Sequence, residues 1–493
     1  MTAATSVYLH ADSPEELVCF ASVQDVARGL AEGQYSAREL TEVFLRRIER
    51  LNSDLGAYVA VLRDEALRTA DESDRRRRAG QSLGLFDGIP VSVKDFAPVK
   101  GAPFTAGLRP LKGHIADVDA TYVRRFREAG AVILGLTNTS EMGHKGITDN
   151  MLFGPTRNPH HLDYNAGGSS GGAAASVAAG LAVVAQGTDG GGSVRIPAAM
   201  CGIVGGIGTA GAWAEETRPD AFAAASPFVR IGALGRSAAD VRAVADLLGR
   251  YSPRDPLSAP AVADVPTARA TRLFFDPHFG DFPVNAEVLD LTHAAVEALA
   301  GRYQVRPGTV CLPSYHDTNR IFVRQASVLM AFVSEQFSNG GVDLLGAHRG
   351  EIPDELADII EMGRGVSALQ QRRDNVVRTE VFDTIEDALE EADVIVTPCL
   401  AVAEVRNEAS GRTLGPRMVA GQAIEPTIGW CLTYPINLSG HPSVSVPIGY
   451  TRRGLPVGLQ IIGARWADRA VLELAEKVIE TLAVPRTGDH LHP

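Results

Sequence analysis

The stretch Gly167-Gly168-Ser169-Ser170-Gly171-Gly172 decides the fold of this chain, together with Gly190-Gly191-Gly192-Ser193-Val194-Arg195 one helix length later. Each segment places serine in a glycine-rich loop. Backbone without side chains can approach a substrate closely and direct several N–H groups at one point. A serine becomes a nucleophile only when another group removes its proton. The two loops therefore predict a hydrolytic site that needs a base from elsewhere in the chain.

Lys94 is the candidate base, because it ends the apolar run Ile89-Pro90-Val91-Ser92-Val93-Lys94. A free lysine has a pKa of about 10.4 and is charged at neutral pH. Burial among Val91, Val93 and Phe96 would disfavour the charged form and lower the pKa. Taken alone, Lys94 is more simply explained as a lysine paired with Asp95, but the serine loops favour a catalytic role.

Two common motifs also match. Gly167-x-Ser169-x-Gly171 fits the nucleophile elbow of α/β-hydrolases, which needs a strand just before it and a histidine downstream. We expect no strand in the polar segment 160–165, and His441 has no evident acidic partner. Gly206-x-Gly208-x-x-Gly211 fits the dinucleotide fingerprint, but Pro219 cuts short the helix that should follow. The histidines lack ligand spacing, so we expect no metal and no cofactor.

The composition is that of a globular protein, with 45% hydrophobic and 22% charged residues and a net charge of -12. An acidic surface disfavours nucleic acid as a partner. The basic run Arg75 to Arg78 is best explained as the solvated end of a helix, with an anionic-lipid or nucleic-acid patch as the alternative. Five widely spaced cysteines fit a reducing compartment. We expect a cytoplasmic chain without a signal peptide or membrane span.

Hydrophobic periodicity predicts strands alternating with helices, and therefore a single large α/β/α sandwich with a central mixed, twisted sheet covered by helices. Helices are expected at 36–52 (after a capping box), 62–78, 118–130, 173–185, 284–301, 353–392 and 467–482, with a strand that starts at 183–186 as the alternative for the end of 173–185. Strands are expected at 89–93, 131–136, 393–398, 443–447 and 458–463, and a long loop at 143–168. One domain would span 1–493, with its core at about 85–215 and 393–480, N-terminal helices at 15–80 and a helical variable region at about 216–392.

The chain resembles the amidase signature family. The resemblance is carried by residues 88–95, 167–172 and 187–198, with support from 136–143, 156–159, 437–442 and 454–460. It covers about residues 20–480 and is weakest across 216–384. It implies an amidohydrolase that uses a Ser-Ser-Lys triad, an acyl-enzyme and an oxyanion hole.

The resemblance also implies a role for each site residue. Ser193 is the nucleophile, Ser169 the bridging serine on a cis peptide bond, and Lys94 the general base. The N–H groups of Gly190, Gly191, Gly192 and Ser193 would hold the oxyanion. The backbone at Gly143 would contact the substrate, Ser170 would support the site, and Asp189 would pair with Arg195 to brace the loop.

The chain departs from the family pattern in places that concern the substrate. Residues 206–213 lack the lysine and arginine that many members carry, and Ile196 stands where the A-type subunits of amidotransferases commonly have glutamine. We expect a stand-alone amidase whose substrates are water and a small aryl, aliphatic or cyclic amide or a carbamate. Ile207 and Trp213 favour an uncharged, partly aromatic substrate. An A-type subunit of an aminoacyl-tRNA amidotransferase is the alternative, a catalytically silent binding protein is the third hypothesis, and a homodimer is left open.

Overall fold

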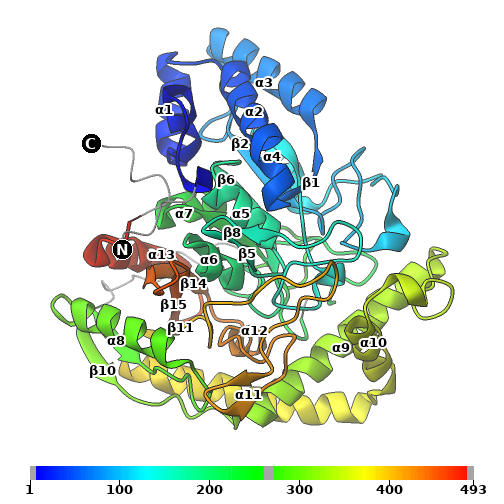
Figure 1. Cartoon of the computed structure of the whole chain (residues 1–493), viewed down its shortest axis with the longest axis vertical. Coiled ribbons are helices and arrows are strands. Elements are labelled where there is room, and N and C mark those ends of the chain that lie inside the picture. The colour runs from blue at the N-terminus through cyan, green and yellow to red at the C-terminus, as the bar shows by residue number, and fades with distance from the viewer. Residues whose placement is uncertain (1–6, 224, 260–270, 486–493) are drawn as a thin grey trace.

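The computed structural model describes residues 7–223, 225–259 and 271–485. Its helices are α1 (Val23–Glu32), α2 (Ala37–Leu55), α3 (Arg63–Arg78), α4 (Thr121–Glu128), α5 (Gly171–Ala178), α6 (Arg195–Cys201), α7 (Ala238–Leu248), α8 (Ala286–Ala300), α9 (Tyr315–Asn339), α10 (Asp354–Gly365), α11 (Ala368–Glu391), α12 (Pro435–Ser439) and α13 (Asp468–Leu482). They surround the strands on several sides in Figure 1.

A mixed sheet of 11 strands runs through the molecule in the order β1-β3-β2-β6-β8-β7-β14-β15-β11-β9-β10. Its members are β1 (Tyr58–Val61), β2 (Pro90–Lys94), β3 (Val132–Thr137), β6 (Val184–Asp189), β7 (Val204–Ile207), β8 (Arg230–Gly235), β9 (Arg272–Phe275), β10 (Gln304–Pro307), β11 (Val394–Pro398), β14 (Ser443–Tyr450) and β15 (Pro456–Gly463). Strand β2 lies parallel to both β3 and β6, whereas β6 and β8 are antiparallel. The predicted fold class is confirmed.

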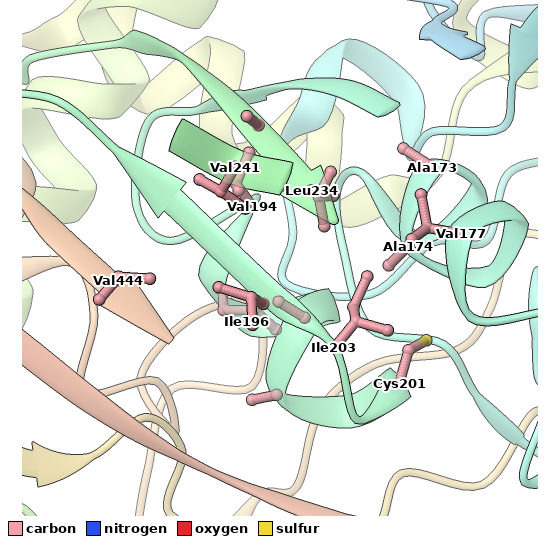
Figure 2. Close-up of a cluster of buried hydrophobic side chains, with 14 of the residues drawn as sticks. Ala173, Ala174, Val177, Val194, Ile196, Cys201, Ile203, Leu234, Val241 and Val444 are labelled. Atoms are coloured by element: carbon pink, nitrogen blue, oxygen red, sulfur yellow. The ribbon is translucent and has the colours of Figure 1, made fainter. Parts of the chain in front are cut away.

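Helices cover both faces of this sheet, as two neighbouring glycines of β7 show. A Cβ on Gly205 would lie 2.6 Å from Ala198 of α6, and one on Gly206 would lie 3.1 Å from Val241 of α7. Successive residues of a strand point to opposite faces, so α6 and α7 lie on opposite sides of the sheet. Figure 2 shows the buried side chains that fill this region, among them Ile196, Val241 and Val444.

Most predicted elements are confirmed, and the exceptions have local causes. The helix expected at 173–185 ends at Ala178, because Gly180 adopts a left-handed φ of 65°. The alternative of a strand that starts at 183–186 is confirmed by β6, which begins at Val184. The helix expected at 353–392 is two helices, α10 and α11, since Ser367 caps the start of α11. The region called helical, 216–392, also contributes β8, β9 and β10 to the sheet. The Pro-rich segment 252–266 separates two helical patterns in the sequence, and its part after residue 259 lies outside the described residues.

The long loop expected at 143–168 contains a small hairpin of β4 (Arg157–Asn158) and β5 (His161–Asn165). Our expectation that 160–165 forms no strand is therefore wrong. This polar strand is held by hydrogen bonds to distant segments: the Asn165 N–H donates to the carbonyl of Val405 at 2.8 Å, and the Asn165 side-chain amide donates to the carbonyl of Thr148 at 3.0 Å. Because β5 belongs to a separate two-stranded ribbon, it is not the sheet strand that a nucleophile elbow requires. A second ribbon pairs β12 (Met418–Val419) with β13 (Gln422–Ala423).

Helices α9 and α10 pack on each other and extend to one side of the molecule (Figure 1). They share a small hydrophobic cluster, separate from the main core, with Leu108, Leu111 and Met142. Lys145 adds an ion pair to this contact, because its Nζ lies 3.2 Å from a carboxylate oxygen of Glu355 on α10. The helix pair is thereby attached to the chain segment that carries Gly143.

Candidate active site

Lys94 ends strand β2 and is completely buried. Its Nζ lies 2.7 Å from Ser169 Oγ and 3.0 Å from Thr188 Oγ1. Burial lowers the pKa of Lys94 to about 7, and the negative charge of Asp189 offsets part of that effect. A substantial fraction of Lys94 is therefore neutral near pH 7, as a general base requires.

Ser169 lies in the loop that connects β5 with α5, and the Gly168–Ser169 peptide bond is cis, as the family resemblance implied. The backbone of Ile147 packs so closely here that a Cβ on Gly168 would lie 2.3 Å from the carbonyl carbon of Ile147. Only glycine fits at this position. The Thr148 hydroxyl donates to the carbonyl of Ser169 at 3.1 Å and fixes the loop.

Ser193 lies between the end of β6 and the start of α6, in a loop organised by Asp189. The Asp189 carboxylate accepts hydrogen bonds from the N–H groups of Gly192 at 2.8 Å and Val194 at 3.1 Å. It also pairs with Arg195 at 2.8 Å, and both side chains are fully buried. Burial alone would raise the pKa of Asp189, but the Arg195 guanidinium holds it well below its usual range. The predicted bracing pair of Asp189 and Arg195 is confirmed.

Ser170 connects the two serine loops. Its N–H donates to the carbonyl of Ser193 at 3.1 Å, and its hydroxyl donates to the carbonyl of Thr188 at 3.2 Å. This contact holds the Ser193 loop against the Ser169 loop, which agrees with the supporting role expected for Ser170.

Two cavities meet at Ser193. The larger, of about 190 Å³, is lined by Ser169, Ser193, Gly143 and Gly190, together with apolar side chains including Phe96, Met142 and Val333. The smaller, of about 80 Å³, is lined by Ser193, Gly143, Gly190 and Gly191 and closed by the α9 side chains Phe322, Val323 and Ala326. Leu329 and Met330 border both cavities. The structure thus brings together most of the predicted site residues around one hollow.

Gly192 is the exception among the predicted oxyanion donors. Its N–H donates to the Asp189 carboxylate, so it is not available to a substrate oxygen in this arrangement. Within the described residues, the N–H groups of Gly190, Gly191 and Ser193 have no protein acceptor. The oxyanion prediction is therefore reduced from four donors to these three.

The comparisons with known proteins fit this geometry. The family model for amidase matches residues 39–472. The chain belongs to the amidase signature family. This amidase is 34% identical to an acylamidase of Rhodococcus erythropolis over 94% of its own length and 95% of the relative. It is 32% identical to the A-type subunit of the glutamyl-tRNA(Gln) amidotransferase of Halorhodospira halophila, covering 92% of this chain and 96% of that protein.

Among solved structures, the amidase resembles a bacterial aryl acylamidase of the amidase signature family with a TM-score of 0.89 at 36% identity, covering 94% of this chain and 96% of that one. A 6-aminohexanoate cyclic dimer hydrolase complexed with substrate matches with a TM-score of 0.78 at 26% identity, over 94% of this chain and 97% of that one. The amidase is thus an enzyme that hydrolyses C–N amide bonds.

The competing motifs find no support in the amidase structure. His441 does have an acidic neighbour, Glu386 at 3.3 Å, which the sequence did not reveal, but Ser169 pairs with Lys94 and not with His441. Gly206 lies inside β7, and a turn rather than a helix follows at Gly211. Among the described residues no group of three or more metal-binding side chains occurs. None of the helices in the described parts of the chain combines the length and the apolar character needed to cross a bilayer.

The structure also places Ile207, Trp213, the basic run of α3 and the cysteines. Ile207 lies buried in β7, and Trp213 lines a neighbouring cavity of about 30 Å³, so neither side chain borders the two cavities at Ser193. Our expectation that these two residues select an aromatic substrate was therefore wrong.

The basic run 75–78 is the end of α3, where Arg76 pairs with Asp87 at 2.5 Å. All five cysteines are free.

Sequence reasoning missed three groups of the site. Thr188 contacts Lys94, and its place near the end of the strand beside β2 could have indicated this. The α9 residues that border the cavities (Phe322, Ala326, Leu329, Met330 and Val333) recur at helical spacing, a pattern that indicates only a buried face. Glu215 lines the larger cavity from an irregular loop and carries no sequence signal.

Proposed function

We propose that this amidase cleaves its substrate through an acyl-enzyme on Ser193. Neutral Lys94 accepts the proton of the Ser169 hydroxyl, and Ser169 takes the proton of Ser193. The Ser193 oxygen then attacks the amide carbonyl, and the N–H groups of Gly190, Gly191 and Ser193 stabilise the negative oxygen. A donor of this kind contributes about 3 kcal/mol in typical cases.

Collapse of the tetrahedral intermediate breaks the C–N bond. Ser169 gives a proton to the leaving nitrogen and takes one back from the Lys94 ammonium, so the amine departs and Lys94 is neutral again. Water then attacks the ester carbonyl, gives its proton to the same relay, and releases the carboxylic acid with Ser193 restored. The observation that carries this proposal is the 2.7 Å contact between buried Lys94 and Ser169, beside a cavity that Ser193 also lines.

We propose an aryl amide with a small acyl group as the substrate. The larger cavity has apolar walls formed by side chains such as Phe96, Met142 and Leu329, which suit an aromatic ring. The smaller one has a volume of only about 80 Å³. The similarity to an acylamidase and to an aryl acylamidase supports the same substrate class.

The alternative function is that of the A-type subunit of an amidotransferase, favoured by the 32% identity to one such protein. We propose instead that the chain acts alone in the cytoplasm, without cofactor, nucleic acid or membrane, as a monomer or homodimer. The net charge of -12 and the free cysteines support this proposal. Turnover of a simple amide by the pure chain, with its mass measured by light scattering, distinguishes the two functions.

The test uses the purified chain with 4-nitroacetanilide and follows release of 4-nitroaniline by absorbance. We expect Ser193→Ala to lower kcat by about 1,000-fold or more with an unchanged circular dichroism spectrum. Exposed Ser82 provides the control, because Ser82→Ala should leave kcat unchanged. A fluorophosphonate should add its mass to the peptide that contains Ser193. Full activity in Ser193→Ala, or labelling of a different serine, would remove the proposed mechanism.

A further inference from the structure

Glu215 is an acidic side chain in a cavity that is otherwise mostly apolar. It lies in the loop between β7 and β8 and lines the larger cavity together with Phe96, Ser169 and Thr188. It also borders the small neighbouring cavity that contains Trp213. Its residue is partly exposed, so a ligand in the larger cavity can reach it.

The carboxyl group of Glu215 has no hydrogen bond or ion pair to any described residue. Its acidic neighbours differ in this respect. Glu216 pairs with Arg124 at 3.1 Å and accepts from the Ser252 hydroxyl at 2.8 Å. Asp255 accepts from two backbone N–H groups, those of Glu215 at 2.8 Å and Leu257 at 2.9 Å.

Within the described residues no cation pairs with Glu215, although Arg230 lines the small neighbouring cavity with it and Arg125 donates to the carbonyl of the residue before it. Burial raises the pKa of Glu215 to about 7, and the nearby negative charge of Asp255 adds to that effect. Burial raises the pKa of the Tyr122 phenol, and the negative charge of nearby Glu215 adds to that shift. A carboxyl group in low-dielectric surroundings without a partner is unfavourable, and a donor supplied by a ligand would relieve this.

The position of Ser169 shows which part of a substrate would meet Glu215. In the proposed mechanism Ser169 protonates the leaving nitrogen, so the amine portion lies on its side of Ser193. Ser169 and Glu215 line the larger cavity and not the smaller one. The smaller cavity is lined by Gly191 and not by Ser169. Because the amine portion lies on the Ser169 side, the smaller cavity is left for the acyl group.

We propose that Glu215 recognises a hydrogen-bond donor, a hydroxyl or an ammonium group, on the amine portion of the substrate. The amidase would then prefer amides of hydroxyl- or amino-substituted aryl amines over those of purely apolar amines. This inference rests on the proposed function, because it takes the assignment of the two cavities from the role of Ser169.

The test compares acetanilides that carry a hydroxyl, an aminomethyl or a methyl group at the 3- or 4-position. We expect Glu215→Leu to lower kcat/KM by about 10- to 100-fold for the hydroxyl and aminomethyl substrates, because hydrogen bonds to charged groups are among the stronger ones. The methyl substrates should stay within about threefold of the wild type, since they make no such bond. Glu215→Gln keeps an acceptor, so it should retain part of the hydroxyl preference and lose the ammonium preference.

Glu216→Gln is the matched control, because Glu216 is the adjacent acid but lines neither cavity. It should leave all the substrate ratios unchanged. Equal losses for hydroxyl and methyl substrates in both Glu215 variants would overturn the inference while the amidase mechanism stands.

Failure of the wild type to hydrolyse any anilide would instead count against the proposed function. The inference is then decided by calorimetry on the Ser193→Ala protein with 4-aminophenol, 4-(aminomethyl)aniline and 4-methylaniline. Tighter binding of the two donor-bearing amines that Glu215→Leu abolishes would support it, and equal affinity for all three would overturn it.

Discussion

Replacing Lys94 by methionine should inactivate the enzyme and at the same time stabilise the fold in a pH-dependent way. Methionine has a similar length and no charge, so it fills the buried site without the cost of a buried ammonium group. Activity should fall by about 100- to 10,000-fold, the usual contribution of a general base. The wild type should also lose activity below a pH of about 7, where Lys94 becomes protonated.

The size of the stability effect follows from the two pKa values of Lys94, about 7 in the folded protein and 10.5 ordinarily. Between these values the unfolded chain binds more protons than the folded protein, so wild-type stability rises with pH. At about 1.4 kcal/mol for each pKa unit, the full cost of holding Lys94 charged is about 5 kcal/mol, present below pH 7 and lost as the pH rises to 10.5. Between pH 6 and pH 9 this cost should fall by about 3 kcal/mol.

Urea unfolding of the wild type and Lys94→Met at pH 6 and pH 9 measures this difference. The free energy of unfolding of the variant minus that of the wild type should be about 3 kcal/mol larger at pH 6 than at pH 9. Effects that do not depend on pH, such as the lost contact with Ser169, cancel in this comparison. Lys112→Met, at an exposed lysine outside the site, controls for loss of a positive charge. The pKa of Glu215 is also raised to about 7, so Glu215→Gln is a second control. This variant should still lose activity below a pH of about 7, because Lys94 causes that loss. A relative stability that does not change with pH would refute a neutral Lys94.

Two further variants test the Ser193 loop. Arg195→Met should lower the free energy of unfolding by about 3–5 kcal/mol, because it leaves Asp189 charged and unpaired in the core; Arg28→Met, which breaks the exposed pair with Asp25, is the control and should change little. A small loss at Arg195 would mean that Asp189 is not charged in the fold. Gly191→Ala places a Cβ 2.6 Å from Phe322, so it should destabilise by about 1–3 kcal/mol and raise KM. Adding Phe322→Leu should restore part of the loss, and an unchanged KM in the single variant would contradict the assigned cavity wall.

The chemistry of this site was predictable because it lies in continuous segments with their own signals. Lys94 follows a run of apolar residues that forms a buried strand, and each serine lies in a glycine-rich loop. The element boundaries that failed were decided by tertiary contacts. The strand at His161–Asn165 depends on backbone and side-chain hydrogen bonds to residues distant in sequence, such as Val405 and Asn407, which hydrophobic periodicity does not reveal.

The substrate-binding surface was not predictable for a different reason. Phe322 is distant in the sequence from the serine loops and reaches the site only because α9 packs there. Trp213 and Glu215 are both close to the Ser193 loop in the sequence, but only Glu215 lines the larger cavity at Ser193. Loop geometry decided which of Trp213 and Glu215, two residues apart, would face the larger cavity.

The attachment of α9 and α10 through a hydrophobic cluster of their own has a consequence for how this enzyme can diversify. Leu329 and Met330 shape both cavities from a helix that takes no part in proton transfer. Substitutions along that helix can alter which amides fit while the strand that carries Lys94 and the glycine loops remain undisturbed. New selectivity can therefore arise in this scaffold without rebuilding its reactive centre.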